Sequence, residues 1–161
     1  MNEMIKVGMA DLNVCLSPNA LTTLGLGSCV GIVLYDKVKK IAGMVHIMLP
    51  DSTKILNNDN KSKFADTGID LLIHKMSAIG ADRRNLIAKI AGGAQMFAFG
   101  ANNEMMRIGD RNVEATKIKL GQLGIKIMAE DTGANYGRTI EFYPENGNLV
   151  IKSVGKQIKI L

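Results

Sequence analysis

The N-terminal third of the chain is a series of short apolar runs separated by polar turns, a pattern typical of β-strands. Strands are predicted at Ile5–Met9, Leu12–Leu16, Leu21–Leu24, Cys29–Tyr35 and Ile41–Met48. The last two flank a short polar segment, Asp36–Lys40, and are therefore predicted to form a hairpin. A longer polar stretch, Asp51–Lys63, follows them and is expected to be a surface loop.

The rest of the chain combines two predicted helices with further strands. Apolar side chains recur every three or four residues over Lys63–Ile79 and Arg111–Leu123, and a glycine follows each segment, as at many helix ends. Strands are expected at Leu86–Ala91, Ile125–Ala129, Thr139–Tyr143 and Leu149–Val154. Strands joined by turns and interrupted by two helices predict one α+β domain over residues 1–161. The expected architecture is a layered sandwich of a mixed, largely antiparallel sheet system with helices packed outside.

The predicted hairpin brings two reactive side chains together. If its turn takes the four residues from Asp36 to Lys39, Cys29 lies directly opposite His46. Directly paired side chains on one face have Cβ atoms about 4.5–5.5 Å apart, so the imidazole can reach the thiol. A slip of one residue in the pairing would place the two side chains on opposite faces.

The same register divides the hairpin into two faces of different character. One face carries large aliphatic side chains and is expected to be core: Val30, Ile32, Leu34, Ile41, Val45 and Ile47. The other face carries Cys29 and His46 among smaller side chains. A substrate is therefore expected to approach the hairpin on that side.

A cysteine beside a histidine can act as a nucleophile, because the imidazole takes the thiol proton and the thiolate attacks. A third polar group normally orients the imidazole, and the Thr23 hydroxyl is the candidate. Two nearby glycines permit a sharp backbone path that directs the N–H groups of Ser28 and Cys29 at a developing oxyanion. The residues alone leave purely structural interpretations open: Cys29 as a small core residue, His46 as a buried hydrogen-bonded histidine, and Thr23 as an ordinary strand residue.

Composition narrows the classes of function. Twenty Lys and Arg against fifteen Asp and Glu give a net charge of +5, but the basic residues are scattered and only 4% of residues are aromatic, which argues against nucleic-acid binding. The two cysteines lack the spacing of a disulfide framework or a zinc site, and Cys15 is expected to be a packed residue. No apolar stretch suits a membrane span or a signal peptide, so a cytoplasmic location is expected.

Methionine and phenylalanine gather in the segment after Gly93. Such a cluster can leave an apolar patch for a partner protein, and Phe97 and Phe99 are the candidate contact residues.

Two stretches of sequence resemble a known family more specifically than any of these patterns. Residues 21–30, LTTLGLGSCV, and 42–50, AGMVHIMLP, resemble the chemoreceptor glutamine deamidase family, CheD. Residues 63–67, 88–97, 108–114 and 129–133 also look like that family's pattern, in order and at the expected spacing. The resemblance covers nearly the whole chain.

The resemblance implies a cytoplasmic bacterial chemotaxis enzyme. It would hydrolyse the side-chain amides of particular glutamines on the cytoplasmic domain of methyl-accepting chemoreceptors, leaving glutamate and ammonia, with no metal or organic cofactor. In such an enzyme Cys29 is the nucleophile, His46 the general base and Thr23 the orienting residue. A fold similar to that of glutamine-deamidating bacterial toxins is also implied.

The family further implies a partner, the chemotaxis phosphatase CheC, for which Phe97 and Phe99 are the predicted contact surface. A non-catalytic regulator that acts by binding CheC is the main alternative function. A cysteine peptidase or a transglutaminase would use the same thioester chemistry on a different bond or with a different acceptor.

Overall fold

The computed structural model describes residues 2–96 and 107–161. The α-helices of this part are α1 (Ala65–Ala78) and α2 (Ile108–Gln122), and short 3-10 helices span Ser52–Lys54, Lys61–Lys63 and Arg83–Asn85. The strands are β1 (Met4–Val7), β2 (Leu12–Leu16), β3 (Ala20–Leu26), β4 (Val30–Asp36), β5 (Ile41–Ile47), β6 (Leu86–Gly92), β7 (Lys126–Thr132), β8 (Arg138–Tyr143), β9 (Asn148–Lys152) and β10 (Lys159–Ile160).

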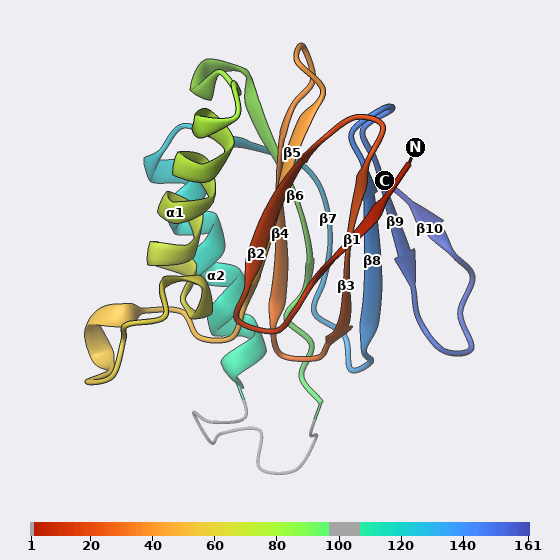
Figure 1. Cartoon of the computed structure of the whole chain (residues 1–161). Coiled ribbons are helices and arrows are strands. Elements are labelled where there is room, and N and C mark those ends of the chain that lie inside the picture. The colour runs from red at the N-terminus through yellow and green to blue at the C-terminus, as the bar shows by residue number, and fades with distance from the viewer. Residues whose placement is uncertain (1, 97–106) are drawn as a thin grey trace.

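The strands form two sheets that lie face to face, and both helices cover the free face of one of them (Figure 1). This central sheet has the order β2-β5-β4-β6-β7, and the outer sheet has the order β1-β3-β8-β9-β10. The pairs β1–β3 and β6–β7 are parallel and the other pairs are antiparallel. The predicted α+β sandwich with a mixed, largely antiparallel sheet system is therefore confirmed, and β10 is a strand that the sequence pattern did not predict.

The helices close the first of two cores. The apolar side of α1 is buried against the central sheet through Ile69, Leu72, Ile73 and Met76. Gly43 on β5 permits this close approach, because a Cβ there would lie 2.7 Å from side-chain atoms of Leu72 and Met76. Burying an aliphatic side chain of this size contributes about 1.5–3 kcal/mol, so the helix is held by packing more than by its own propensity.

The second core fills the space between the sheets, and it corrects one expectation. The six aliphatic residues assigned to the core face of the hairpin do lie in the helix-side core, as predicted. The opposite face, expected to be open to substrate, packs instead against the outer sheet through residues such as Val33, Met44, Ile140 and Phe142. A period-two pattern assigns side chains to a face, but it does not reveal that a second sheet covers that face.

The register of the β4–β5 hairpin differs from the prediction by two residues. Gly31, and not Cys29, lies directly opposite His46. The cause is Asp36, which stays in β4 because its buried carboxylate accepts hydrogen bonds from the backbone N–H groups of Val38 and Lys39. The turn therefore takes residues 37–40. An even shift leaves each side chain on its predicted face, so Cys29 and His46 become diagonal neighbours on one face.

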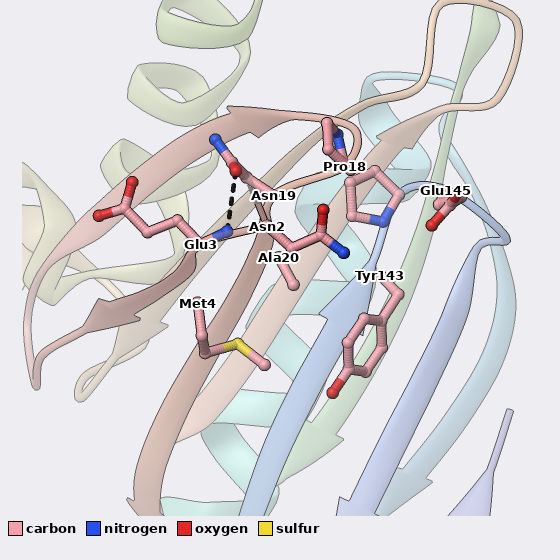
Figure 2. Close-up of a pocket in the computed structure, with 9 residues that line it drawn as sticks. Asn2, Glu3, Met4, Pro18, Asn19, Ala20, Tyr143 and Glu145 are labelled. Atoms are coloured by element: carbon pink, nitrogen blue, oxygen red, sulfur yellow. Dashed lines mark hydrogen bonds between the residues drawn. The ribbon is translucent and has the colours of Figure 1, made fainter.

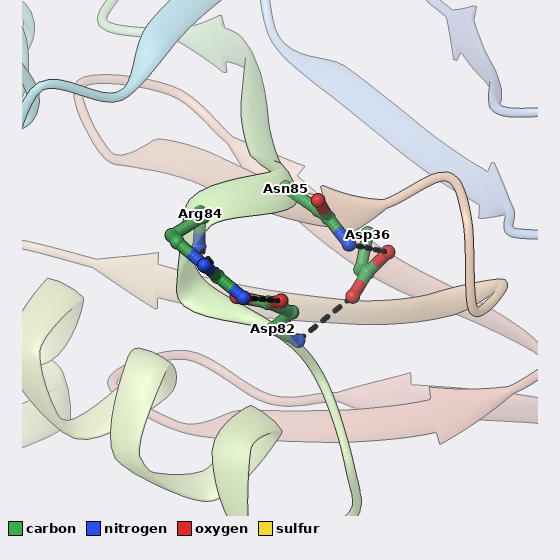
Figure 3. Close-up of polar contacts among 4 residues, drawn as sticks. All are labelled: Asp36, Asp82, Arg84 and Asn85. Carbon is green, nitrogen blue, oxygen red and sulfur yellow. Dashed lines mark hydrogen bonds and ion pairs between the residues drawn. The ribbon is translucent and has the colours of Figure 1, made fainter.

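The same carboxylate also fixes the entrance to β6. It accepts hydrogen bonds from the Asp82 backbone N–H at 2.8 Å and from Asn85 Nδ2 at 3.3 Å, while Arg84 pairs with the Asp82 side chain (Figure 3). Burial alone would raise the pKa of Asp36, but these donors together outweigh it and hold the pKa below its ordinary value. The register of the hairpin is thus fixed by tertiary contacts.

Candidate active site

His46 lies fully buried on β5, between the two sheets. Its backbone N–H donates to the carbonyl of Asp11 and its carbonyl accepts from the N–H of Ala10, so the turn between β1 and β2 fixes its main chain. The ring points toward the outer sheet, where Nδ1 lies 2.7 Å from Thr23 Oγ1 on β3. The predicted pairing of histidine and threonine side chains is present.

The hydrogen bonds of Thr23 determine which ring nitrogen of His46 carries the proton. Thr23 Oγ1 lies 2.7 Å from the Val7 carbonyl oxygen on β1, and a carbonyl can only accept. The single hydroxyl proton therefore goes to Val7, and Nδ1 must donate its proton to Thr23 Oγ1. In the neutral imidazole, Nε2 is then the nitrogen with a free lone pair.

This Nε2 atom is buried and has no hydrogen-bond partner among the described residues. Burial lowers the pKa of His46, so the ring is neutral at neutral pH. An unsatisfied buried acceptor costs about 1–3 kcal/mol, which is a reason to look for a role beyond packing. A neutral imidazole with a lone pair that no other group occupies is a competent proton acceptor.

Cys29 stands at the end of the segment that joins β3 to β4. It precedes Gly31 by two residues, so it lies on the His46 face and diagonal to the histidine, where side chains are about 7–8 Å apart or somewhat closer. The residue is 7% exposed. Burial raises the pKa of the Cys29 thiol, and a hydrogen bond from its own backbone N–H partly offsets this. The resting pair is therefore a neutral thiol beside a neutral imidazole.

Three donors hold the carbonyl groups of residues 27–29, which carry the candidate nucleophile and are called the nucleophile loop. The N–H of Ala94 donates to Gly27 O at 2.8 Å, Asn112 Nδ2 donates to Ser28 O at 2.9 Å, and the N–H of Gly93 donates to Cys29 O at 2.8 Å. In a trans peptide the C=O and the following N–H point in opposite directions. The Ser28 and Cys29 N–H groups are thus turned away from these donors, and neither donates to a backbone carbonyl in the described ranges.

Gly92 lets β6 approach this loop. Its φ is +110°, and a Cβ there would lie 2.3 Å from Cys29 O. Gly92 and Gly93 both have positive φ, which glycine adopts without strain. The sequence pattern did not reveal that these glycines serve the backbone of Cys29.

Asn112 is the residue of this site that sequence reasoning missed. It is fully buried on α2 and reaches both the nucleophile loop and Met48 O, which lies two residues beyond His46. The signal was present: Asn112, Thr116 and Leu120 follow each other at four-residue spacing on the buried face of α2. A polar amide at such a position requires buried partners.

Comparison with known proteins identifies the family. The family model described as CheD chemotactic sensory transduction matches residues 48–153. The chain is 69% identical over 159 residues to a "Probable chemoreceptor glutamine deamidase CheD" of Lachnoclostridium phytofermentans, covering 99% of both chains. It is 61% identical over 155 residues to the "Chemoreceptor glutamine deamidase CheD" of Halalkalibacterium halodurans, covering 96% of both. The chain belongs to the CheD family.

A solved structure of a Neisseria meningitidis protein of the DUF152 family is a more distant match. It has 9% sequence identity and a TM-score of 0.49, over 82% of this chain and 64% of that protein. The similarity to the fold of deamidating toxins stays a prediction.

Two hollows lie at the other end of this CheD chain. The cavity of about 160 Å³ in Figure 2 is bordered by Pro18, Asn19 and Ala20, where β3 begins, whereas Cys29 follows the end of β3. A groove of about 620 Å³ lies by the β4–β5 turn and Gly147. Neither hollow borders Cys29 or His46, so the candidate site is a buried pair of side chains between the two sheets.

Three further sequence expectations concern partners and cofactors. Phe97 and Phe99, the predicted contact residues for CheC, lie outside the described residues. Within residues 2–96 and 107–161, no three His, Cys, Asp or Glu side chains gather as a metal site would require. In the same ranges, no helix has both the length and the apolar character needed to cross a membrane.

Proposed function

We propose that this chain is a chemoreceptor glutamine deamidase in which Cys29 is the nucleophile, His46 the general base and Thr23 the residue that orients the imidazole. The observation that carries the proposal is the Val7–Thr23–His46 hydrogen-bond chain. It leaves the lone pair of Nε2 without a partner, on the same face as the Cys29 thiol. The relatives named as chemoreceptor glutamine deamidases supply the substrate class.

The reaction follows from these positions. Nε2 takes the thiol proton as sulfur attacks the amide carbon of a glutamine side chain, and the N–H groups of Ser28 and Cys29 receive the oxyanion. The imidazolium then gives its proton to the leaving nitrogen, so the C–N bond breaks and ammonia departs. Water, deprotonated by the same nitrogen, hydrolyses the thioester to glutamate and restores the thiol.

The burial of the pair favours a side-chain amide over a main-chain peptide bond as substrate. His46 and Thr23 are fully buried and Cys29 is only slightly exposed. A glutamine side chain is unbranched and carries its amide at the end of a thin stem, so it can enter a narrow opening. A peptide bond between two residues carries side chains on both sides, which such an opening excludes.

Mass analysis of a chemoreceptor fragment tests the proposal. A purified cytoplasmic fragment of a receptor from the same organism, incubated with this protein, is expected to gain the mass of one amide-to-acid conversion at each modified glutamine and to release an equal amount of ammonia. Hydrolysis in isotopically heavy water should place a solvent oxygen in each new carboxylate. No mass gain on several receptors would favour the binding role toward CheC instead.

The pH dependence of activity provides a second test. His46 must be neutral to accept the thiol proton, and burial lowers its pKa below the ordinary 6.5. The value of kcat/KM for a receptor fragment is therefore expected to stay level through pH 6.5 and to fall only at more acidic pH. An acid limb centred above 6.5 would contradict the assignment of a buried neutral base.

The free energy of unfolding is also expected to fall at acidic pH. The unfolded chain binds a proton at His46 near pH 6.5, whereas the folded chain resists it until lower pH. The contribution of His46 to stability is thus fully present above 6.5 and is lost as the pH falls through the lowered pKa.

A further inference from the structure

We propose that Asn112 is a positioning residue that orients the oxyanion-binding amide of Cys29, with its own side chain anchored on Met48 O beyond the end of β5. The proposal rests on the proposed deamidase function. It assigns a role to a helix residue whose chemistry that mechanism does not otherwise use.

The side chain of Asn112 bonds to two segments of the candidate site. Its Nδ2 donates to Ser28 O at 2.9 Å and to Met48 O at 3.0 Å. Ser28 directly precedes the nucleophile, and Met48 lies two residues beyond the base on the continuation of β5. A carboxamide nitrogen has two protons, so one side chain uses both donors to hold the two reacting segments.

The bond to Ser28 O fixes the direction of the peptide group between Ser28 and Cys29. Ser28 O and the Cys29 N–H belong to the same planar trans peptide, so they point in opposite directions. A donor that holds Ser28 O therefore also fixes where the Cys29 N–H points. The Cys29 N–H therefore points away from Asn112, and it belongs to the residue whose thiol attacks the substrate carbonyl, which is where an oxyanion donor is needed.

The site uses the donors of Asn112 and not its acceptor. Asn112 Oδ1 is buried and has no hydrogen-bond partner among the described residues. Aspartate has nearly the same shape, but it would place a carboxylate oxygen against two carbonyl oxygens. The structure thus requires an amide at this position for a reason that size alone does not explain.

The test compares two Asn112 variants with a matched control on the same helix face. Asn112→Asp keeps the shape and loses the donors, and Asn112→Ala loses the donors without adding a charge. Thr116→Val removes a buried hydroxyl one turn along, which donates to the Asn112 main-chain carbonyl. Thermal unfolding of each variant identifies any that fails to fold. If Asn112→Asp fails to fold, Asn112→Ala still tests the proposal.

Two rates distinguish positioning of the amide from general damage. Both Asn112 variants are expected to lose about 100-fold in kcat for glutamine deamidation with little change in KM, as when an oxyanion donor is removed. Alkylation of Cys29 by iodoacetamide, which needs the thiolate but forms no oxyanion, should change by less than about threefold, because the Cys29–His46 pair itself is intact. Thr116→Val should keep the kcat of the wild type.

Three results would overturn the proposal. An Asn112→Ala protein with unchanged kcat would show that the two hydrogen bonds are not needed. Equal losses in kcat and alkylation rate would mean that Asn112 only supports the fold. Wild-type protein that releases no ammonia would remove the proposed deamidase function, and with it this role.

Discussion

A Cys29→Ala chain is expected to release no ammonia from a chemoreceptor fragment and to unfold at nearly the temperature of the wild type. The loss should be about 10⁴-fold or more, to the background rate, because the covalent step disappears with the thiol. Cys15 cannot replace it: it lies on β2, its thiol donates to Asn19 O, and burial raises its pKa to about 11. Ammonia release and intact mass of the receptor fragment measure the effect.

Stability should change little in this variant. The substitution removes a single sulfur atom from a buried side chain and leaves the backbone unchanged, so the free energy of unfolding should fall by only about 1 kcal/mol. Cys15→Ala is the matched control, since it removes the other buried thiol and should keep full activity. A Cys29→Ala protein that deamidates at a tenth of the wild-type rate or more would refute a cysteine nucleophile. Removal of the nucleophile from a catalytic triad lowers kcat far more than tenfold.

A His46→Asn chain is expected to fold and to lose about 10²–10⁴-fold in kcat, the range that general-base catalysis contributes. The asparagine amide nitrogen falls near the position of Nδ1 and can still donate to Thr23 Oγ1, so the bond that joins the two sheets is kept. What disappears is the atom at the Nε2 position, which accepts the thiol proton. Steady-state deamidation and the pH dependence of Cys29 alkylation measure the loss.

The control for this variant is Met44→Leu. Met44 lies two residues earlier on β5, is fully buried on the same face, and contributes only packing. A swap of similar volume should cost less than about 1.5 kcal/mol and leave kcat unchanged. If His46→Asn and Met44→Leu reduced activity equally, the histidine would be a packing residue, as the purely structural interpretation of the sequence has it.

The sequence by itself determined both α-helices, most of the strands and the faces of the hairpin. Alternation along 29–35 and 41–48 places the aliphatic residues of both strands on one side and Cys29 and His46 together on the other, and this assignment survives the two-residue error in register. It survives because side chains in a strand alternate with a period of two, so only an odd shift exchanges the faces. The CheD resemblance then gave a role to Cys29, His46 and Thr23 that the spacing left open.

Only the tertiary structure decided what surrounds these residues. The register depends on Asp36, whose carboxylate is held by donors from the following turn and from residues far along the chain. The tautomer of His46 depends on the pairing of β1 with β3, which places the Val7 carbonyl next to Thr23. Local patterns do not reveal either outcome in full, because Asp82, Asn85 and Val7 are distant in sequence from the side chains that they contact.

The contacts that hold the nucleophile loop are also decided only by the tertiary structure. Gly92, Ala94 and Asn112 come from β6, the segment after it and α2, and they meet Gly27, Ser28 and Cys29 only in the folded chain. Sequence periodicity reports which side of an element is buried, and Asn112, four residues before Thr116, lies on the buried side of α2. It does not report which carbonyl groups a buried donor meets there, since that is fixed by how the layers pack.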